Sequence, residues 1–200
     1  AGSGDWEVMT NPLLDTASLP RFTAITPEHI APALDRVIDD HQAAVAEVLQ
    51  AQPVSFANTW LPLERAETAL DAVWSAISHL RNVADTPELR SAHATGQGRL
   101  VHHQMEVLQN RALYDVLVAL TQSADFAQLP QADRIAVERA IRDFVLAGVA
   151  LDPVARARFA EISVELSALS TEFGSAVLDA TEAWSEHVTQ EAMLAGISPA

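Results

Sequence analysis

The sequence predicts an all-α protein: an elongated bundle of antiparallel helical hairpins with one long C-terminal helix and an extended N-terminal arm. Alanine and leucine dominate, whereas there are only 7 glycines in 200 residues. The prolines fall between segments in which apolar residues recur every three or four positions, and no segment alternates as a half-buried strand does. These observations favour helices packed against helices.

The N-terminal arm covers Met9–Ile25, where Pro12 and Pro20 block regular structure. We expect its leucines and Phe22 to anchor this arm on the helices. Residues 1–8, AGSGDWEV, are small or polar and join no downstream pattern. We interpret them as vector-derived residues before a native start at Met9, with a ragged natural N-terminus as the alternative. The helical domain is therefore expected to span residues 9–200.

The first helix is predicted to begin at Thr26-Pro27-Glu28, which combines a capping hydroxyl, a proline at the first position and an acid in the first turn. Pro32 predicts that this first turn is distinct from the regular helix, which continues to about Gln50. A second helix begins near Pro62, and its apolar residues continue to Ala84 at steps of three and four.

The third helix is expected to begin at Thr86-Pro87-Glu88, which repeats the earlier start pattern, and to run toward Leu108. Gly96 and Gly98 should each weaken it by about 1 kcal/mol relative to alanine. This glycine pair lacks the preceding strand of a dinucleotide-binding motif, so helix packing or a kink explains it better. The pattern leaves open whether the helix continues or kinks into residues 110–121. A further helix is predicted for residues 131–146.

The last helix has the clearest pattern. Its apolar residues recur about every 3.6 positions, the period of a straight α-helix, and define a line about 43 Å long. Such a long line predicts a helix that packs along several partners. The residues of the line are Phe159, Ile162, Leu166, Leu169, Phe173, Val177, Ala180, Trp184 and Val188.

Charge and composition exclude several classes of protein. Acidic residues outnumber lysine and arginine 27 to 12, giving a net charge of −15, whereas nucleic acids and anionic membranes select basic surfaces. No apolar run approaches the roughly 20 residues that span a bilayer, and the N-terminus lacks the pattern of a secretory signal. There is no cysteine, which excludes disulfides and thiolate chemistry. We expect a cytoplasmic protein without nucleic-acid or membrane partners.

The histidines provide no convincing metal site. A zinc peptidase helix would carry HExxH, and this string is absent. The neighbours Glu28-His29 and Glu186-His187 diverge around a helix, so each makes a poor pair of ligands. His102 and Glu106 share a face at i and i+4 but lack a third ligand nearby. We favour a surface hydrogen bond there. The hypothesis that His102, His103 and Glu106 bind a metal ion remains as an alternative.

Asp179 and Glu182 lie one helical turn apart beside Trp184, as paired catalytic acids would. The apolar line of their helix is already filled by Val177, Ala180 and Trp184, which places the two acids on a solvated flank. There is no GxSxG nucleophile motif either, and the tryptophans have spacings compatible with a core. The prediction is therefore that the chain contains no catalytic, cofactor-binding or metal-ligating residue.

Seven strings of the sequence carry more information than its composition. They are MTNPLL (9–14), LPRF (19–22), ITPEHIAPAL (25–34), ISHLRNVADTPELRSAH (77–93), QNRALY (109–114), IRDFVLAGVALDP (141–153) and ARFAEISVELSALSTEFGSAVLDATEAW (157–184). These strings resemble the N-terminal region of the thimet oligopeptidase family of zinc metallopeptidases, and the resemblance covers Met9 to about Ile197. One departure is Gly98 with Val101-His102-His103, where the family carries a proline and Ser-Glu-Tyr.

This resemblance implies a two-lobed helical enzyme that encloses a channel, in which a zinc-activated water cuts short peptides. The family's HExxH helix would lie beyond Ala200, so the zinc of the parent enzyme would have no ligand in this chain. The chain would be a non-catalytic, channel-forming N-terminal region whose partners are the missing catalytic domain and short peptides. We expect weak self-association of the isolated chain. The alternative is a free-standing helical scaffold or binding protein related to the peptidase.

Overall fold

The computed structural model describes residues 11–15, 18–190, 193 and 195–196, so the residues interpreted as vector-derived lie outside it. All regular elements in this part are helices, which confirms the all-α prediction. No described helix is long and apolar enough to cross a membrane. The elements are η1 (Phe22–Ala24), η2 (Pro27–His29), α2 (Ile30–Gln50), η3 (Phe56–Trp60), α3 (Leu61–Val83), α4 (Pro87–Leu108), α5 (Arg111–Thr121), η4 (Phe126–Gln128), α6 (Gln131–Leu146) and α7 (Pro153–Glu182).

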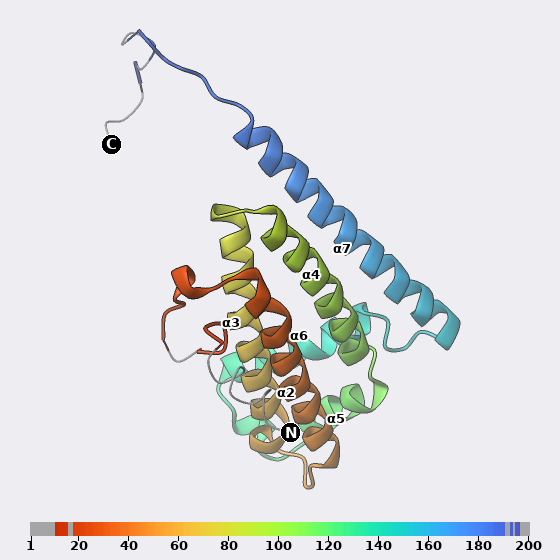
Figure 1. The fold of residues 1–200 in the computed structure, drawn as a ribbon. Helices are drawn as coiled ribbons and strands as arrows, with labels where there is room; N and C mark the ends of the chain where they lie inside the picture. Colours follow the sequence, from red (N-terminus) through yellow and green to blue (C-terminus); the bar gives the residue numbers. More distant parts are fainter. Residues whose placement is uncertain (1–10, 16–17, 191–192, 194, 197–200) are drawn as a thin grey trace, which may run out of the picture.

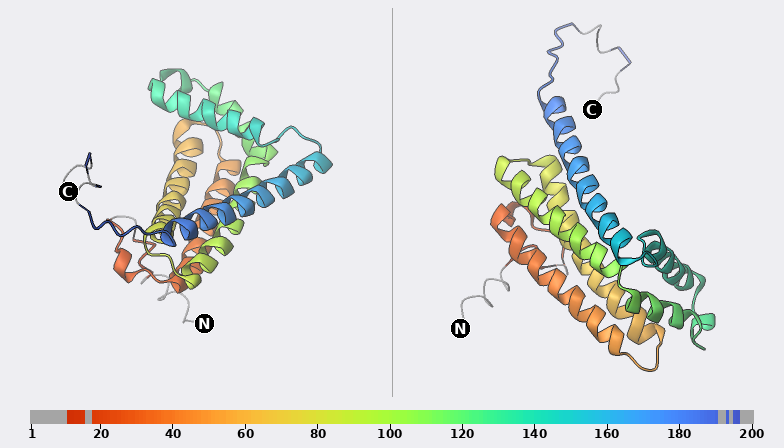
Figure 2. Two further views of the ribbon diagram at one scale, coloured as in Figure 1. Left: turned by 90° about the horizontal axis from the view of Figure 1, so that it is seen from above. Right: turned by 90° about the vertical axis from the view of Figure 1, so that its right-hand side faces the viewer.

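Helices α2, α3 and α4 lie side by side and form the body of the molecule (Figure 1). Helices α5 and α6 pack against each other at one end of this body. Helix α7 runs along the outside of α4, and the chain that follows it leads away from the other helices (Figure 2). The elongated shape and the short connections between α2, α3 and α4 are consistent with the predicted helical hairpins.

The start of the first helix follows its sequence pattern. The Thr26 backbone N–H donates to Nδ1 of His29 at 3.0 Å, which closes the short turn η2. The regular helix α2 begins after that turn, at Ile30, with Pro32 in its first turn. Proline is tolerated there because the first backbone N–H groups of a helix have no partner within the helix. The prediction of a distinct first turn is therefore confirmed.

Helices α4 and α5 are separate. Helix α4 runs without interruption through Gly96 and Gly98 to Leu108. Asn110 then caps the next helix, because its Oδ1 accepts a hydrogen bond from the N–H of Leu113 at 3.1 Å. A cap at this position ends one helix and starts another, so the third helix does not continue into residues 111–121.

The largest core cluster lies between α2, α3 and α4, with contributions from the N-terminal arm. Leu13 of the arm is buried, and Leu14 and Ile25 pack against the cluster. Leu19 is 88% exposed and therefore does not anchor the arm. Two smaller clusters fill the end at which η3, α5 and α6 meet. The prediction that the arm is anchored by its apolar residues thus holds for some of them.

Helix α7 departs from the sequence prediction in both its end and its packing. Asp152 caps its start by accepting bonds from the N–H groups of Val154 and Ala155 at 2.9 and 3.1 Å. The helix ends at Glu182, so Trp184 and Val188 lie beyond it. No α7 residue is fully buried. The prediction that its apolar line packs along several helices of this chain is therefore wrong.

The face of α7 that lies against α4 consists largely of small and hydroxyl-bearing residues. These half-buried residues include Ala160, Ser163, Ser167, Thr171 and Ser175. Short side chains allow two helices to approach closely, since the distance between axes depends on the side chains at the contact. The apolar line lies largely in solvent: Leu166 is 62% exposed, Leu169 55% and Phe173 72%. Periodicity detects an apolar line but cannot tell whether its partner belongs to the same chain.

Candidate functional site

Asp179 of α7 pairs with an arginine of α4 and not with Glu182. Its Oδ1 lies 2.7 Å from Nη2 of Arg90, and its Oδ2 accepts from Nη1 at 2.9 Å. The hydrogen bond from Arg90 holds the pKa of the Asp179 carboxyl below its ordinary value. Arg90 also pairs with Asp85, in the connection between α3 and α4. Asp179 therefore helps to hold α7 on the α3–α4 pair.

The three residues of the metal hypothesis, His102, His103 and Glu106, are not brought together. Nε2 of His102 lies 3.3 Å from Oε1 of Glu106, and both side chains are exposed. His103 is buried and its Nε2 lies 3.0 Å from Nδ1 of His41 on α2. Within the described ranges, no three His, Asp or Glu side chains are placed to hold a metal ion. The observed contact of His102 is the surface pair with Glu106.

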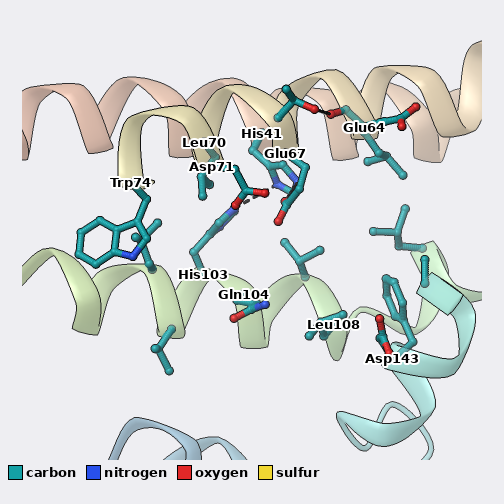
Figure 3. A pocket seen from close by; sticks show the side chains of 18 of the residues that line it. His41, Glu64, Glu67, Leu70, Asp71, Trp74, His103, Gln104, Leu108 and Asp143 are labelled. Atoms are coloured by element: carbon teal, nitrogen blue, oxygen red, sulfur yellow. Dashed lines mark hydrogen bonds and ion pairs between the residues drawn. The ribbon is translucent and has the colours of Figure 1, made fainter. Parts of the chain in front are cut away.

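A pocket of about 640 Å³ opens between α3 and α4 and extends to α5 and α6 (Figure 3). Its walls are largely apolar and include Trp60 and Trp74, which are both half-buried. The volume is within the range of small-molecule sites. This pocket is the strongest candidate for a functional site in the described part of the chain.

A chain of hydrogen bonds crosses one wall of the pocket and joins α2, α3 and α4. Oε2 of Glu67 lies 3.2 Å from Nε2 of His41, and Nδ1 of His41 lies 3.0 Å from Nε2 of His103. An ionised carboxylate can only accept, so with both rings neutral His41 donates from Nε2 and accepts at Nδ1. His103 then donates from Nε2 and has a lone pair at Nδ1. That Nδ1 is buried and has no hydrogen-bond partner among the described residues.

The pKa directions agree with this assignment. The hydrogen bond from His41 is the main cause that lowers the pKa of Glu67 and keeps it ionised. Burial is the main cause that lowers the pKa of His103 and favours its neutral form. Asp71, one turn beyond Glu67 on α3, has a raised pKa because of burial and then because of the Glu67 charge. Asp71 makes no ion pair with any side chain in the part of the chain that the structure describes.

The carboxylates that line the pocket give it a negative charge. Its lining contains four carboxylates and neither lysine nor arginine. The sequence analysis missed this site. Glu67, Asp71 and Trp74 at helical spacing were a local indication of it, but His41 and His103 are 62 positions apart and meet only through the packing of α2 against α4. The carboxylates of the lining are Glu64, Glu67, Asp71 and Asp143.

Known proteins are similar to this chain over nearly its whole length. A family model described as the N-terminal domain of neurolysin/thimet oligopeptidase matches residues 34–156. Oligopeptidase A of Haemophilus influenzae is 39% identical over 189 residues, which are 94% of this chain and 28% of that protein. Oligopeptidase A of Salmonella typhimurium is 40% identical over 190 residues, again 94% of this chain and 28% of the relative.

A plant relative shows the same partial coverage. The organellar oligopeptidase A of Arabidopsis thaliana, chloroplastic/mitochondrial, is 32% identical over 195 residues, which are 98% of this chain and 25% of that protein. The chain thus spans 25% to 28% of the length of these three relatives.

Proposed function

Because the chain belongs to the neurolysin/thimet oligopeptidase family, as that family's N-terminal domain, we propose that it forms the N-terminal helical region of a zinc metallo-oligopeptidase. In this proposal the chain contributes one wall of a channel that admits short peptides and excludes folded proteins. The observation that carries it is the similarity to oligopeptidase A over 94% of the chain. We place the enzyme in the cytoplasm, and one Arabidopsis thaliana relative is described as a probable cytosolic oligopeptidase A.

The side chains that the structure describes do not fit a zinc site. His41 has both ring nitrogens engaged, by Glu67 and by His103. His102 and Glu106 form an exposed pair, and no third His, Asp or Glu completes a metal site within the described residues. A catalytic zinc site has three protein ligands and an open position. We therefore propose that the zinc ligands and the catalytic residues of the parent enzyme lie outside residues 1–200.

The proposal is tested by the reading frame that encodes this chain. We expect the frame to continue beyond codon 200 into an HExxH helix, and the extended protein to cleave a fluorogenic short peptide in a zinc-dependent manner. Residues 1–200 assayed alone should show no cleavage. Metal-dependent peptidase activity in residues 1–200 would overturn the assignment of the chemistry. A stop codon after Ala200 would favour the alternative, a free-standing helical scaffold that shares the family's ancestry.

We further propose that the apolar line of α7 contacts the catalytic part of the parent enzyme. The opposite face of α7 is held on α4 by Arg90 and Asp179, so the apolar side chains point away from the rest of this chain. Contiguous exposed apolar surface of this kind marks an interaction site more often than a free surface. In the isolated chain we expect other copies to contact the same line.

Self-association of residues 1–200 should therefore depend on the apolar line of α7. The expected result in sedimentation experiments is an average mass that rises with protein concentration. Replacing both Leu169 and Phe173 with aspartate should abolish this rise, since both side chains are exposed and their loss does not disturb a core. The matched control replaces Ala43 and Ala46 with aspartate; both are exposed on α2, away from α7, so the change adds the same charge and should leave the association intact. A wild-type chain that stays monomeric at all concentrations would contradict this expectation.

A further inference from the structure

The pocket between α3 and α4 has two neighbouring carboxylates that pair with neither a lysine nor an arginine among the described residues. Glu67 and Asp71 occupy positions i and i+4 of α3, which places them on the same face of the helix. Glu67 contacts the ring of His41 and no lysine or arginine, and Asp71 forms no ion pair with any described side chain. Like charges at this spacing repel each other. A cation bound between them would remove that repulsion.

The walls beside these carboxylates favour a particular kind of cation. Trp60 and Trp74 both line the pocket, together with leucines of α3, α4 and α5. An aromatic face attracts a cation, and the apolar walls gain by covering an apolar group. A metal ion or a strongly hydrated inorganic cation would leave these walls without a partner. The pocket therefore suits an organic cation with an apolar body.

His103 supplies an independent indication of a ligand that donates hydrogen bonds. Its ring extends from α4 across the pocket toward α3 (Figure 3), and the residue is 5% exposed. The hydrogen-bond chain from Glu67 through His41 leaves the Nδ1 of His103 as an acceptor, and no described donor reaches it. Buried acceptors are normally paired. A ligand with several N–H donors could satisfy this nitrogen as well as the two carboxylates.

We propose that this pocket binds a protonated primary amine carried on an apolar group of about the size of a phenylethyl unit. The ammonium group would lie near Glu67, Asp71 and His103, and the apolar group would lie against the tryptophans. Anions are disfavoured because the lining carries four carboxylates and no lysine or arginine. A free aralkylamine and the amino terminus of a peptide share this chemistry. The proposal does not depend on the peptidase assignment, because it concerns this chain alone.

The test uses three probes that share a phenylethyl group and carry a cationic, a neutral or an anionic head group: 2-phenylethylammonium, 2-phenylethanol and 3-phenylpropionate. Each is titrated into residues 1–200 at pH 7, with binding followed by calorimetry and by the indole N–H signals in NMR spectra. We expect the ammonium probe to bind with a Kd of about 1 mM or below, as a ligand of this size allows. The signals of Trp60 and Trp74 should shift, whereas that of exposed Trp184 should not. The alcohol and the carboxylate should bind at least about fivefold more weakly.

Two variants test which carboxylates the ammonium probe needs for binding. Asp71→Asn and Glu67→Gln should each weaken binding of the ammonium probe by about fivefold, the effect of losing one half-exposed ion pair. Both side chains are exposed, so the folded state should persist, which circular dichroism can confirm. Glu165→Gln on α7 is the matched control, since it removes one carboxylate outside the pocket and should leave the affinity unchanged.

Two results would overturn the proposal. Equal binding of all three probes would show that the pocket is apolar and does not select ligands by charge. If the ammonium probe did not bind at concentrations up to millimolar, the pocket would not be an amine site. A further pair of probes distinguishes the sources of the amine. If Leu-Phe-amide binds more tightly than 2-phenylethylammonium and its N-acetylated form does not bind, the ligand is a peptide amino terminus. If neither peptide binds although the small amine does, the ligand is a free amine.

Discussion

Leu34→Ala is expected to lower the free energy of unfolding by about 3 kcal/mol, as truncation of a fully buried leucine does. Leu34 is 0% exposed and lies in the cluster between α2, α3 and α4. Its removal leaves a cavity that three helices cannot all close, because each is also held by other core residues. The melting temperature should fall by about 6 to 12 °C for a chain of this size. Thermal and urea unfolding followed by circular dichroism measure the effect.

The control is Leu169→Ala on the apolar line of α7. Leu169 is 55% exposed, so its truncation removes little buried surface and should change the stability by less than about 0.5 kcal/mol. The sequence alone would rank the two leucines equally, since both occupy an apolar line at helical spacing. A loss of stability of similar size in the two variants would mean that the apolar face of α7 is buried in the isolated chain.

Gly96→Val should destabilise the protein by about 2 to 3 kcal/mol through overpacking. A Cβ atom at position 96 would lie 2.7 Å from Cδ1 of Leu34 and 3.2 Å from the ring of Trp74. Leu34 is enclosed by the core and cannot move away freely. Valine has a higher helix propensity than glycine, but only by a few tenths of a kcal/mol, so the steric cost decides the sign. Urea unfolding at equilibrium gives the change in free energy.

Gly98→Val is the matched control for this effect. No atom lies within 4 Å of a Cβ placed at Gly98, in the same helix. We expect it to stabilise the protein by a few tenths of a kcal/mol, because only the helix propensity changes. The double variant Leu34→Ala with Gly96→Val should be more stable than the sum of the two single effects predicts, since the smaller residue makes room for the larger one. Strict additivity would contradict the proposed contact.

The prediction that the glycine pair serves helix packing is confirmed for one member of the pair. Gly96 allows α4 to approach Leu34 and Trp74, whereas Gly98 lies in open space. The sequence could not distinguish them, because two positions in one helix point in different directions and only the neighbours decide which side needs room. The predicted reduction in helix propensity applies to both residues equally.

The sequence by itself determined the helices and the family. Capping residues, prolines and apolar spacing depend on neighbours within a few positions, so they predicted the start of the first helix, the residues of α6 and the helical character of α7 correctly. The resemblance carried by long strings was confirmed, because a family model matches residues 34–156 and a relative is 39% identical over 94% of the chain. Helix starts and apolar spacing depend on residues that are close together in the sequence. This part of the fold could therefore be predicted from the sequence.

The tertiary structure decided which side chains meet. It placed the Ser and Thr side chains of α7 against α4, left the apolar line in solvent, and directed Asp179 to Arg90. It also joined Glu67, His41 and His103 from three helices beside a pocket that no local pattern indicated. The period of a helix gives the angle between its own side chains but not the rotation of that helix relative to its neighbours. That rotation, set by packing over the whole domain, decides whether a side chain faces a core, a pocket or solvent.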